Sequence, residues 1–229
     1  HNYCRRFMNN EHTLIGNNEL TIEDLASFWQ AIAKEFSTFK NIYGYGLMNE
    51  PHDLAPETKW FDMAQASINA IREVDTNTLI MVGGNDWSSA ERWIEQSDTL
   101  KFLKDPANNL AFEAHVYFDK DASGTYKYSY EEEECYPEKG IDRVKPFVEW
   151  IKQNKFHGFI GEYGIPDNDP RWNETLDLFL GYLQENGING TYWAAGPWWD
   201  TYFMAITPKD GKDRPQMPII EKYTSTLKK

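Results

Sequence analysis

The chain of 229 residues contains no apolar run long enough to cross a bilayer, and it has few cysteines and few basic residues. Its two cysteines, Cys4 and Cys135, exclude a disulfide framework and the paired spacing of a zinc site, while one bond between them is left open. The 23 basic residues stand against 36 acidic ones, and the resulting net charge of -13 argues against a nucleic-acid partner. We therefore expect a globular chain that needs no membrane, nucleic acid, metal or other cofactor.

Aromatic side chains are abundant by contrast. They make up 15% of the residues and include nine tryptophans, which is more than a core alone requires. Flat aromatic rings suit the apolar faces of pyranose sugars, so this composition favours a carbohydrate ligand. The acidic run from Glu131 to Glu134 predicts a solvated loop.

The hydrophobic pattern alternates between strands and helices to the end of the chain. Apolar runs predict strands over 42–48, 79–82, 110–117, 156–160 and 188–193. Helical spacing predicts helices over 22–36, from Pro56 through Ile71, from Ser88 or Ser89 through Trp93, and over 141–153, 173–185 and 217–227. Thr21 can cap the first of these helices together with Asp24 three residues on. Because the strands are continuously apolar, we expect a parallel sheet inside a shell of helices, forming one domain over residues 1–229.

Two of these strands lead directly to a glutamate. Glu50 follows the first of them and Glu162 the fourth. A buried carboxylate is costly, so a pair of them favours a catalytic task such as sugar hydrolysis, although two surface glutamates without a shared site are the alternative. In a closed β/α barrel the carboxyl ends of all strands meet at one face. The other polar or aromatic residues at these ends are Asn49, Asn85, Trp87, His115, Tyr117 and Trp193.

The motifs around these positions resemble glycoside hydrolase family 5. They are Asn49-Glu50-Pro51, His115-Val116-Tyr117 and Gly161-Glu162-Tyr163-Gly164, and residues 117–125 are similar to the endoglucanase subfamily shared by fungi and bacteria. The resemblance implies an α/β fold, a (β/α)8 TIM barrel in which this chain carries strands four to eight. Strands one to three, with an arginine that contacts the nucleophile, are absent from the sequence.

The resemblance also implies the roles of individual residues. Glu50 matches the general acid/base on the fourth strand and Glu162 the nucleophile on the seventh, which implies a retaining mechanism with about 5 Å between the two carboxylates. The remaining substrate-binding candidates are His1, Asn49, His115, Tyr117 and Trp193, with Trp87, Trp198 and Trp199 as weaker ones. We interpret His12, His52 and His157 as ordinary loop residues, and His52 is the only one of them expected near the site.

These matches imply a secreted, extracellular endo-β-1,4-glucanase that hydrolyses cellulose or related β-glucans. A mannanase, a xyloglucanase or a mixed-linkage glucanase on the same scaffold is the enzymatic alternative. A glycan-binding derivative without catalysis is the alternative from another class. Five strands of an eight-stranded barrel leave two open edges, so we expect aggregation, a swapped copy or a separate N-terminal fragment, unless the missing strands are simply unrecorded.

Overall fold

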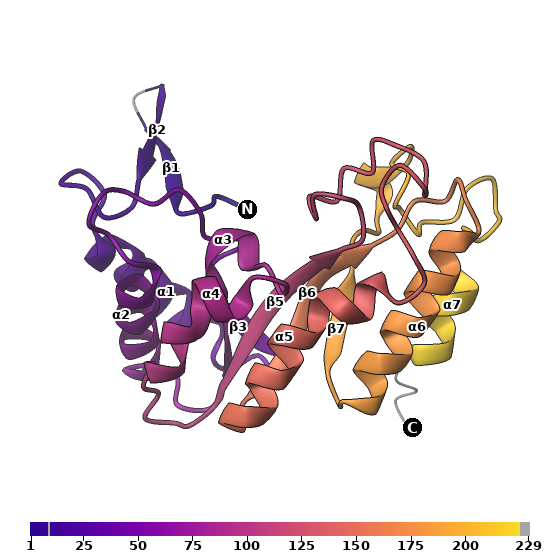
Figure 1. Cartoon of the computed structure of the whole chain (residues 1–229). Coiled ribbons are helices and arrows are strands. Elements are labelled where there is room, and N and C mark those ends of the chain that lie inside the picture. Colours follow the sequence, from indigo (N-terminus) through magenta and orange to yellow (C-terminus); the bar gives the residue numbers. More distant parts are fainter. Residues whose placement is uncertain (9, 225–229) are drawn as a thin grey trace. The chain divides into compact units, whose positions relative to one another are not determined.

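The computed structural model describes residues 1–8 and 10–224, which form two compact units. The first unit comprises His1–Ala114 and Trp150–Phe159, and the second comprises His115–Glu149 and residues 160–224 of the described part. Figure 1 shows the order of their elements along the chain. None of the helices in the described part of the chain is both long and apolar enough to cross a membrane.

The central sheet contains five strands, each lying beside the previous one in the sequence. They are β3 (Gly44–Gly46), β4 (Leu79–Gly83), β5 (Leu110–Tyr117), β6 (His157–Gly164) and β7 (Asn189–Tyr192), in the order β3-β4-β5-β6-β7. The β3–β4 and β4–β5 pairs are parallel, with Tyr45 opposite Ile80 and Val82 opposite Phe112. This sequential parallel order is the one that alternating strands and helices predict.

In the first unit, helices α1 (Ile22–Phe36) and α2 (Trp60–Arg72) pack against each other. The predicted capping box of α1 is confirmed, because the Thr21 hydroxyl accepts a hydrogen bond from the Asp24 N–H at 3.2 Å and the Asp24 carboxylate accepts one from the Thr21 N–H at 2.8 Å. Trp60, Ile68 and Ile80 are fully buried in the core of this unit.

In the second unit, α6 (Arg171–Glu185) and α7 (Met217–Tyr223) lie side by side (Figure 1). The Tyr223 hydroxyl joins them by donating a hydrogen bond to the Asp177 carboxylate at 2.7 Å. Helix α5 (Lys139–Asn154) contributes its first eleven residues to this unit, where Phe118 and Phe179 pack with their ring centroids 5.2 Å apart. The predicted helix over 217–227 ends earlier, and its residues 225–227 lie outside the described part.

Two helix predictions are wrong at the loops that follow β3 and β4. The helix expected from Pro56 begins at Trp60, because Glu57 has a left-handed φ of 63° that interrupts it. The helix expected from Ser88 or Ser89 is replaced by α3 (Asn85–Ser88) and α4 (Trp93–Ser97). Left-handed backbone at Asp86, Trp87 and Ser88 breaks the helical path there.

Other differences concern the ends of strands and the burial of single residues. β3 is shorter than the predicted 42–48, and β6 continues to Gly164, so Glu162 lies within the strand. The short antiparallel hairpin of β1 (Arg5–Met8) and β2 (Glu11–Leu14) was not predicted, and His12 lies in it. Both cysteines are free, and burial raises the pKa of the Cys4 thiol to about 12.

The acidic run is only partly solvated, contrary to the sequence-based expectation. Glu133 is 3% exposed, and its carboxylate accepts hydrogen bonds from the backbone N–H groups of Lys120 at 2.8 Å and Tyr128 at 2.9 Å. A buried carboxylate that accepts such bonds satisfies donors of a loop that has no other secondary structure. Glu133 is therefore a structural residue of this loop.

We predict that replacing Asp75 with Asn lowers the stability of the fold and weakens its dependence on acid. Burial opposes ionisation of Asp75, but hydrogen bonds from Thr78, Asn77 and Tyr45 outweigh it and lower the pKa of this carboxyl to about 2. Because the folded pKa lies below the unfolded one, the stabilisation is fully present above about pH 4 and is lost as the pH falls through about 2. The ionised Asp75 carboxylate contributes about 2 kcal/mol to the free energy of unfolding at neutral pH.

Denaturant unfolding at several pH values measures this effect. The Asp75→Asn variant should be less stable than wild type at neutral pH, and the difference should shrink as the pH falls from 4 towards 2. Asp213→Asn, which changes an exposed aspartate, is the matched control and should leave the curve unchanged. If the difference in free energy of unfolding between wild type and Asp75→Asn stayed constant across this pH range, ionisation of the Asp75 carboxyl would not be its cause.

Candidate active site

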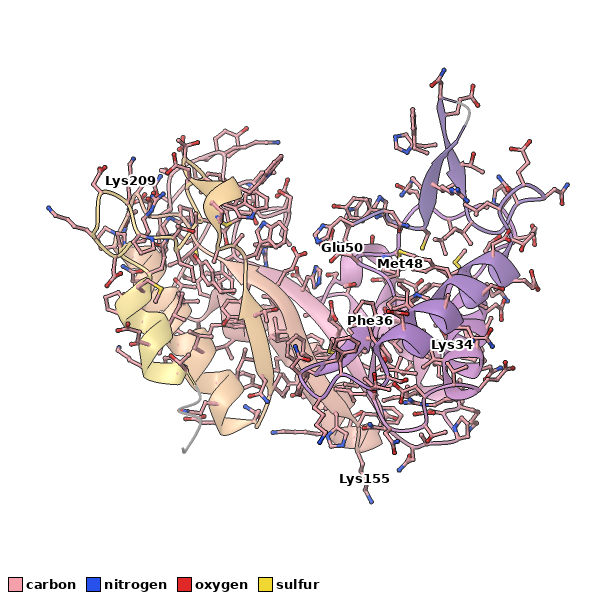
Figure 2. The ribbon with its side chains drawn as sticks, turned by 180° about the vertical axis from the view of Figure 1, so that it is seen from behind. Lys34, Phe36, Met48, Glu50, Lys155 and Lys209 are labelled. Atoms are coloured by element: carbon pink, nitrogen blue, oxygen red, sulfur yellow. The ribbon has the colours of Figure 1, made fainter. Side chains whose placement is uncertain are left out.

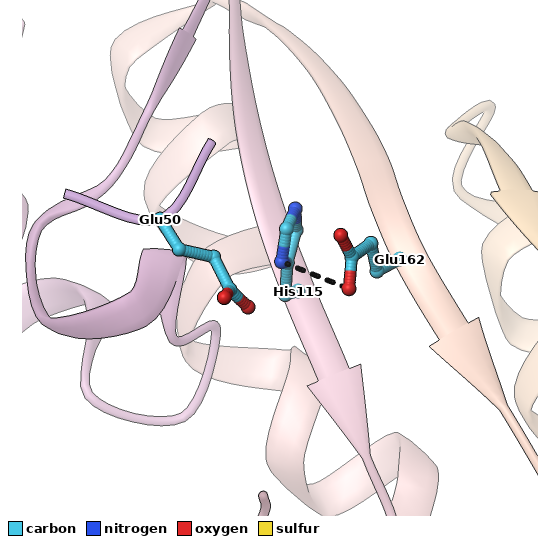
Figure 3. Close-up of side chains that lie close together, drawn as sticks. All are labelled: Glu50, His115 and Glu162. Carbon is cyan, nitrogen blue, oxygen red and sulfur yellow. Dashed lines mark ion pairs between the residues drawn. The ribbon is translucent and has the colours of Figure 1, made fainter. Parts of the chain in front are cut away.

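In the second unit, two of the predicted site residues, His115 and Tyr117, lie beside the carboxylate of a third, Glu162. The Tyr117 hydroxyl donates a hydrogen bond to Glu162 Oε2 at 2.8 Å. His115 Nδ1 lies 3.7 Å from the same oxygen (Figure 3). His115 and Tyr117 are two residues apart on β5 and therefore point to the same side of the sheet, as the sequence predicts. All three residues are at most 8% exposed. A phenol donor at this distance favours the ionised form of a carboxylate.

The end of β5 is held by a buried arginine of α5. The Arg143 guanidinium donates hydrogen bonds to the carbonyl oxygens of Tyr117 and, at 3.0 Å, Lys120. Arg143 is 7% exposed, so its charge lies against backbone carbonyls with little access to water. This contact fixes the backbone that carries the Tyr117 hydroxyl.

Trp193 directly follows β7 and is held against the end of β6. Its backbone N–H donates to the Tyr163 carbonyl at 2.9 Å. A Cβ at position 164 would lie 2.4 Å from the Trp193 carbonyl oxygen, which explains why this position is glycine. The Trp193 indole packs edge-to-face on Trp199 with centroids 5.0 Å apart, whereas Trp198 is 89% exposed.

Tyr202 is a residue near Glu162 that the sequence did not single out. Burial raises the pKa of its hydroxyl, the negative charge of Glu162 raises it further, and a hydrogen bond with Trp193 lowers it. Its ring lies 5.0 Å from that of Trp199. The run of aromatic residues from Trp198 to Phe203 was the available signal, because it places several rings just after the last strand.

In the first unit, Glu50 comes shortly after the chain leaves β3 (Figure 2). Its side chain is partly buried, and its backbone is left-handed with a φ of 48°. The neighbouring Asn49 has its Nδ2 atom 3.3 Å from Nδ1 of His1. The structure thus brings together His1 and Asn49, and both line a cavity of about 720 Å³ that Trp29 and Met48 also border.

Trp87 lies in the first unit with one ring face covered. Its indole stacks on the imidazole of His52, with ring centroids 3.9 Å apart and an interplanar angle of 10°. Both rings border a cavity of about 260 Å³. Asn85 borders it as well, with its side-chain amide donating to the Gln96 carbonyl at 2.8 Å.

The interpretation of His12 and His157 as loop residues is wrong, because His12 lies in β2 and His157 is the first residue of β6. His52 does lie in a loop, but it contacts both the loop of Glu50 and the exposed Trp87. The signal for His52 was its place directly after the Asn49-Glu50-Pro51 motif. Residues two apart, such as Glu50 and His52, contact each other when the loop between them turns sharply. The sequence does not show this turn.

A buried carboxylate with a phenol donor and flanking aromatic rings is typical of the active site of an enzyme that acts on carbohydrate. The sequence profile of the family Cellulase (glycosyl hydrolase family 5) matches residues 1–198. The chain belongs to this family. The expected fold class, a (β/α)8 barrel, is confirmed by the family and by its solved structures.

Three relatives illustrate the similarity. Endo-beta-1,4-glucanase B of Emericella nidulans is 36% identical over 193 residues, which cover 82% of this chain and 56% of that protein. The structure of Pseudomonas stutzeri endoglucanase Cel5A in complex with cellobiose has a TM-score of 0.88 and 42% identity over 96% of this chain and 65% of that one. XacCel5A in complex with cellopentaose has a TM-score of 0.83 and 38% identity over 93% and 69%.

Proposed function

We propose that the protein is a retaining endo-β-1,4-glucanase. The chain spans little more than half the length of the curated relative described above, so its own activity is inferred. The observation that carries the proposal is the hydrogen bond from Tyr117 to Glu162, because it gives one buried carboxylate a donor that stabilises its charge. An ionised carboxylate is what attack on the anomeric carbon requires.

The proposed reaction is a double displacement. Glu162 attacks the anomeric carbon and forms a covalent glycosyl-enzyme, while Glu50 protonates the departing glycosidic oxygen. Water then attacks the anomeric carbon and displaces the Glu162 carboxylate, while Glu50 accepts the proton of the water as a general base. Support for Glu50 in this role comes from its place after β3, because the carboxyl ends of barrel strands lie on the catalytic face. Retention requires the two carboxylates to be about 5 Å apart.

The remaining candidate residues are proposed to bind the sugar or to orient the nucleophile. We propose that Asn49, with His1 beside it, hydrogen-bonds the reacting sugar, and that His115 orients the Glu162 carboxylate. Trp193 offers a stacking surface for the reacting sugar, and Trp87 and Trp198 offer exposed rings for neighbouring sugars.

The substrate is proposed to be a β-1,4-glucan. Two of the similar structures contain cellobiose or cellopentaose. Since a polymeric glucan does not enter a cell, we propose that the protein acts outside it, which fractionation of the producing culture would test. The family resemblance implies barrel strands one to three and an arginine that contacts the nucleophile. Both stay predictions.

Two measurements test the proposed function. Release of reducing sugar should be faster from carboxymethylcellulose than from glucomannan, and barley β-glucan shows whether mixed linkages are also cut. NMR of the first product should show the β-anomer. An inverted product would refute the retaining mechanism, and absence of hydrolysis together with retained binding would indicate a glycan-binding protein.

Replacing Trp193 with Ala should raise KM and lower kcat together. A stacked ring contributes about 1 to 2 kcal/mol, so kcat/KM for cello-oligosaccharides should fall about 5- to 30-fold. Steady-state kinetics on cellotetraose and cellopentaose measure this. The matched control is Trp193→Phe, which keeps an aromatic face and should lose much less. An unchanged kcat/KM in the alanine variant would show that the indole serves packing alone.

A further inference from the structure

His52 contacts two parts of the first unit, the loop of Glu50 and the side chain of Trp87, to which the proposed function assigns different tasks. It follows Glu50 by two residues, and its ring covers one face of Trp87. The backbone of Glu50 is left-handed, with a φ of 48°, which is unfavourable for a residue with a Cβ unless its surroundings hold it there. A contact to this backbone therefore bears on where the carboxylate points.

The hydrogen bonds of His52 define its tautomer. Its Nδ1 lies 2.8 Å from the carbonyl oxygen of Glu50, and its Nε2 lies 3.3 Å from the NH1 group of Arg5. A guanidinium only donates, so Nε2 is the acceptor and Nδ1 carries the proton. The imidazole thus donates to the Glu50 carbonyl and accepts from Arg5.

Arg5 is itself held in place by the start of the chain. Its NH1 group donates to the Tyr3 carbonyl at 2.6 Å, and its NH2 group lies 3.4 Å from the Asp53 carbonyl. The Tyr3 ring lies 5.1 Å from the imidazole of His52. His52 is therefore held at both ring nitrogens and packs beside the tilted Tyr3 ring, as expected of a residue that orients another.

The second contact of His52 is the stack on Trp87. The backbone at Asp86, Trp87 and Ser88 is left-handed at three successive residues, and the Arg92 guanidinium donates to the Asp86 carboxylate beside it. This loop places the indole outward, where it is 43% exposed. One face of the indole packs on the imidazole with centroids 3.9 Å apart, and this contact restricts the orientation of the ring.

We propose that His52 is a positioning residue that fixes the backbone of Glu50 through its Nδ1–H and holds Trp87 as a sugar platform through its ring. This proposal rests on the proposed function, because it assigns Glu50 as the acid and Trp87 to the sugar. The two tasks use different parts of one side chain, so two substitutions separate them.

His52→Phe keeps a ring for Trp87 and removes the donor to Glu50. Phenyl cellobioside, whose leaving group needs protonation, should lose about 10- to 100-fold in kcat/KM, as expected for a misplaced general acid. Dinitrophenyl cellobioside, whose leaving group departs without a proton, should change less than about threefold. A purely structural role would lower both rates equally.

His52→Asn keeps a donor near the Nδ1 position and removes the ring. The leaving-group dependence should stay as in wild type, while KM for cellopentaose should rise about 5- to 10-fold, in line with weakened stacking on Trp87. Thermal melting of both variants, compared with wild type, monitors the fold.

The outcomes separate this proposal from the proposed function. If Glu50→Ala shows the leaving-group dependence and His52→Phe does not, the positioning role is overturned and the function stands. If neither shows it, the assignment of Glu50 fails. One measurement needs no activity and no variant: ¹⁵N NMR of the protein in mildly alkaline solution should show His52 protonated at Nδ1. Protonation at Nε2 instead would overturn the proposal.

Discussion

The Glu162→Gln variant should lose at least about 1,000-fold in kcat on soluble cellulose, because the amide cannot form the glycosyl-enzyme. Its carbonyl oxygen can still accept the hydrogen bond from Tyr117, so the fold and the surrounding side chains should be retained. Cellobiose binding should therefore change little, since sugar stacking and hydrogen bonding do not depend on the nucleophile. Initial rates of reducing-sugar release and isothermal titration calorimetry measure the two effects.

Glu149→Gln is a suitable control for this experiment. Glu149 is an exposed residue of α5 in the same unit, and its loss should leave both the rate and the binding near wild-type values. If the Glu162→Gln enzyme kept more than about a tenth of wild-type kcat, the nucleophile would have to be another residue.

The Glu50→Ala variant should lose about 10²- to 10⁴-fold in kcat/KM on cellulose, because the leaving oxygen departs without a proton. With dinitrophenyl cellobioside the first step should remain fast, and the intermediate should then accumulate because no base activates water. Stopped-flow measurement of phenolate release should show a burst. Added azide, which needs no base, should speed the second step and give a glycosyl azide of β configuration.

The combination of burst and azide rescue is specific to the acid/base residue of a retaining enzyme. Glu35→Gln, on the exposed side of α1 in the same unit, is the matched control and should behave as wild type. Uniform loss on both substrates without azide rescue would remove Glu50 from the proposed mechanism.

The local sequence pattern was enough to predict those helices and strands whose defining residues lie close together in the sequence. The capping box of Thr21 and Asp24 predicted the start of α1, and continuous apolar runs predicted β4 and β5. The same kind of information predicted that His115 and Tyr117 share a side, because residues two apart on a strand always do. The motifs around Glu50 and Glu162 indicated the family, which the profile match confirms.

Contacts between distant residues decided what these patterns left open. The left-handed backbone at Glu57 and at residues 86–88 replaced the expected helix starts, because loop geometry follows from packing and outweighs weak helical propensity. Glu133 is buried where its carboxylate accepts hydrogen bonds from the backbone N–H groups of Lys120 and Tyr128, a contact that depends on how the loop folds back.

For the site, the sequence by itself determined which chemical groups are present and on which strands they lie. Only the tertiary structure decided that the Tyr117 hydroxyl meets Glu162 Oε2 and that Tyr202 lies within reach of its charge. It also decided that His52 stacks on Trp87, a residue 35 positions away. The physical reason is that strand periodicity sets the side to which a residue points, whereas hydrogen bonds and ring stacking depend on distances that only the folded chain sets.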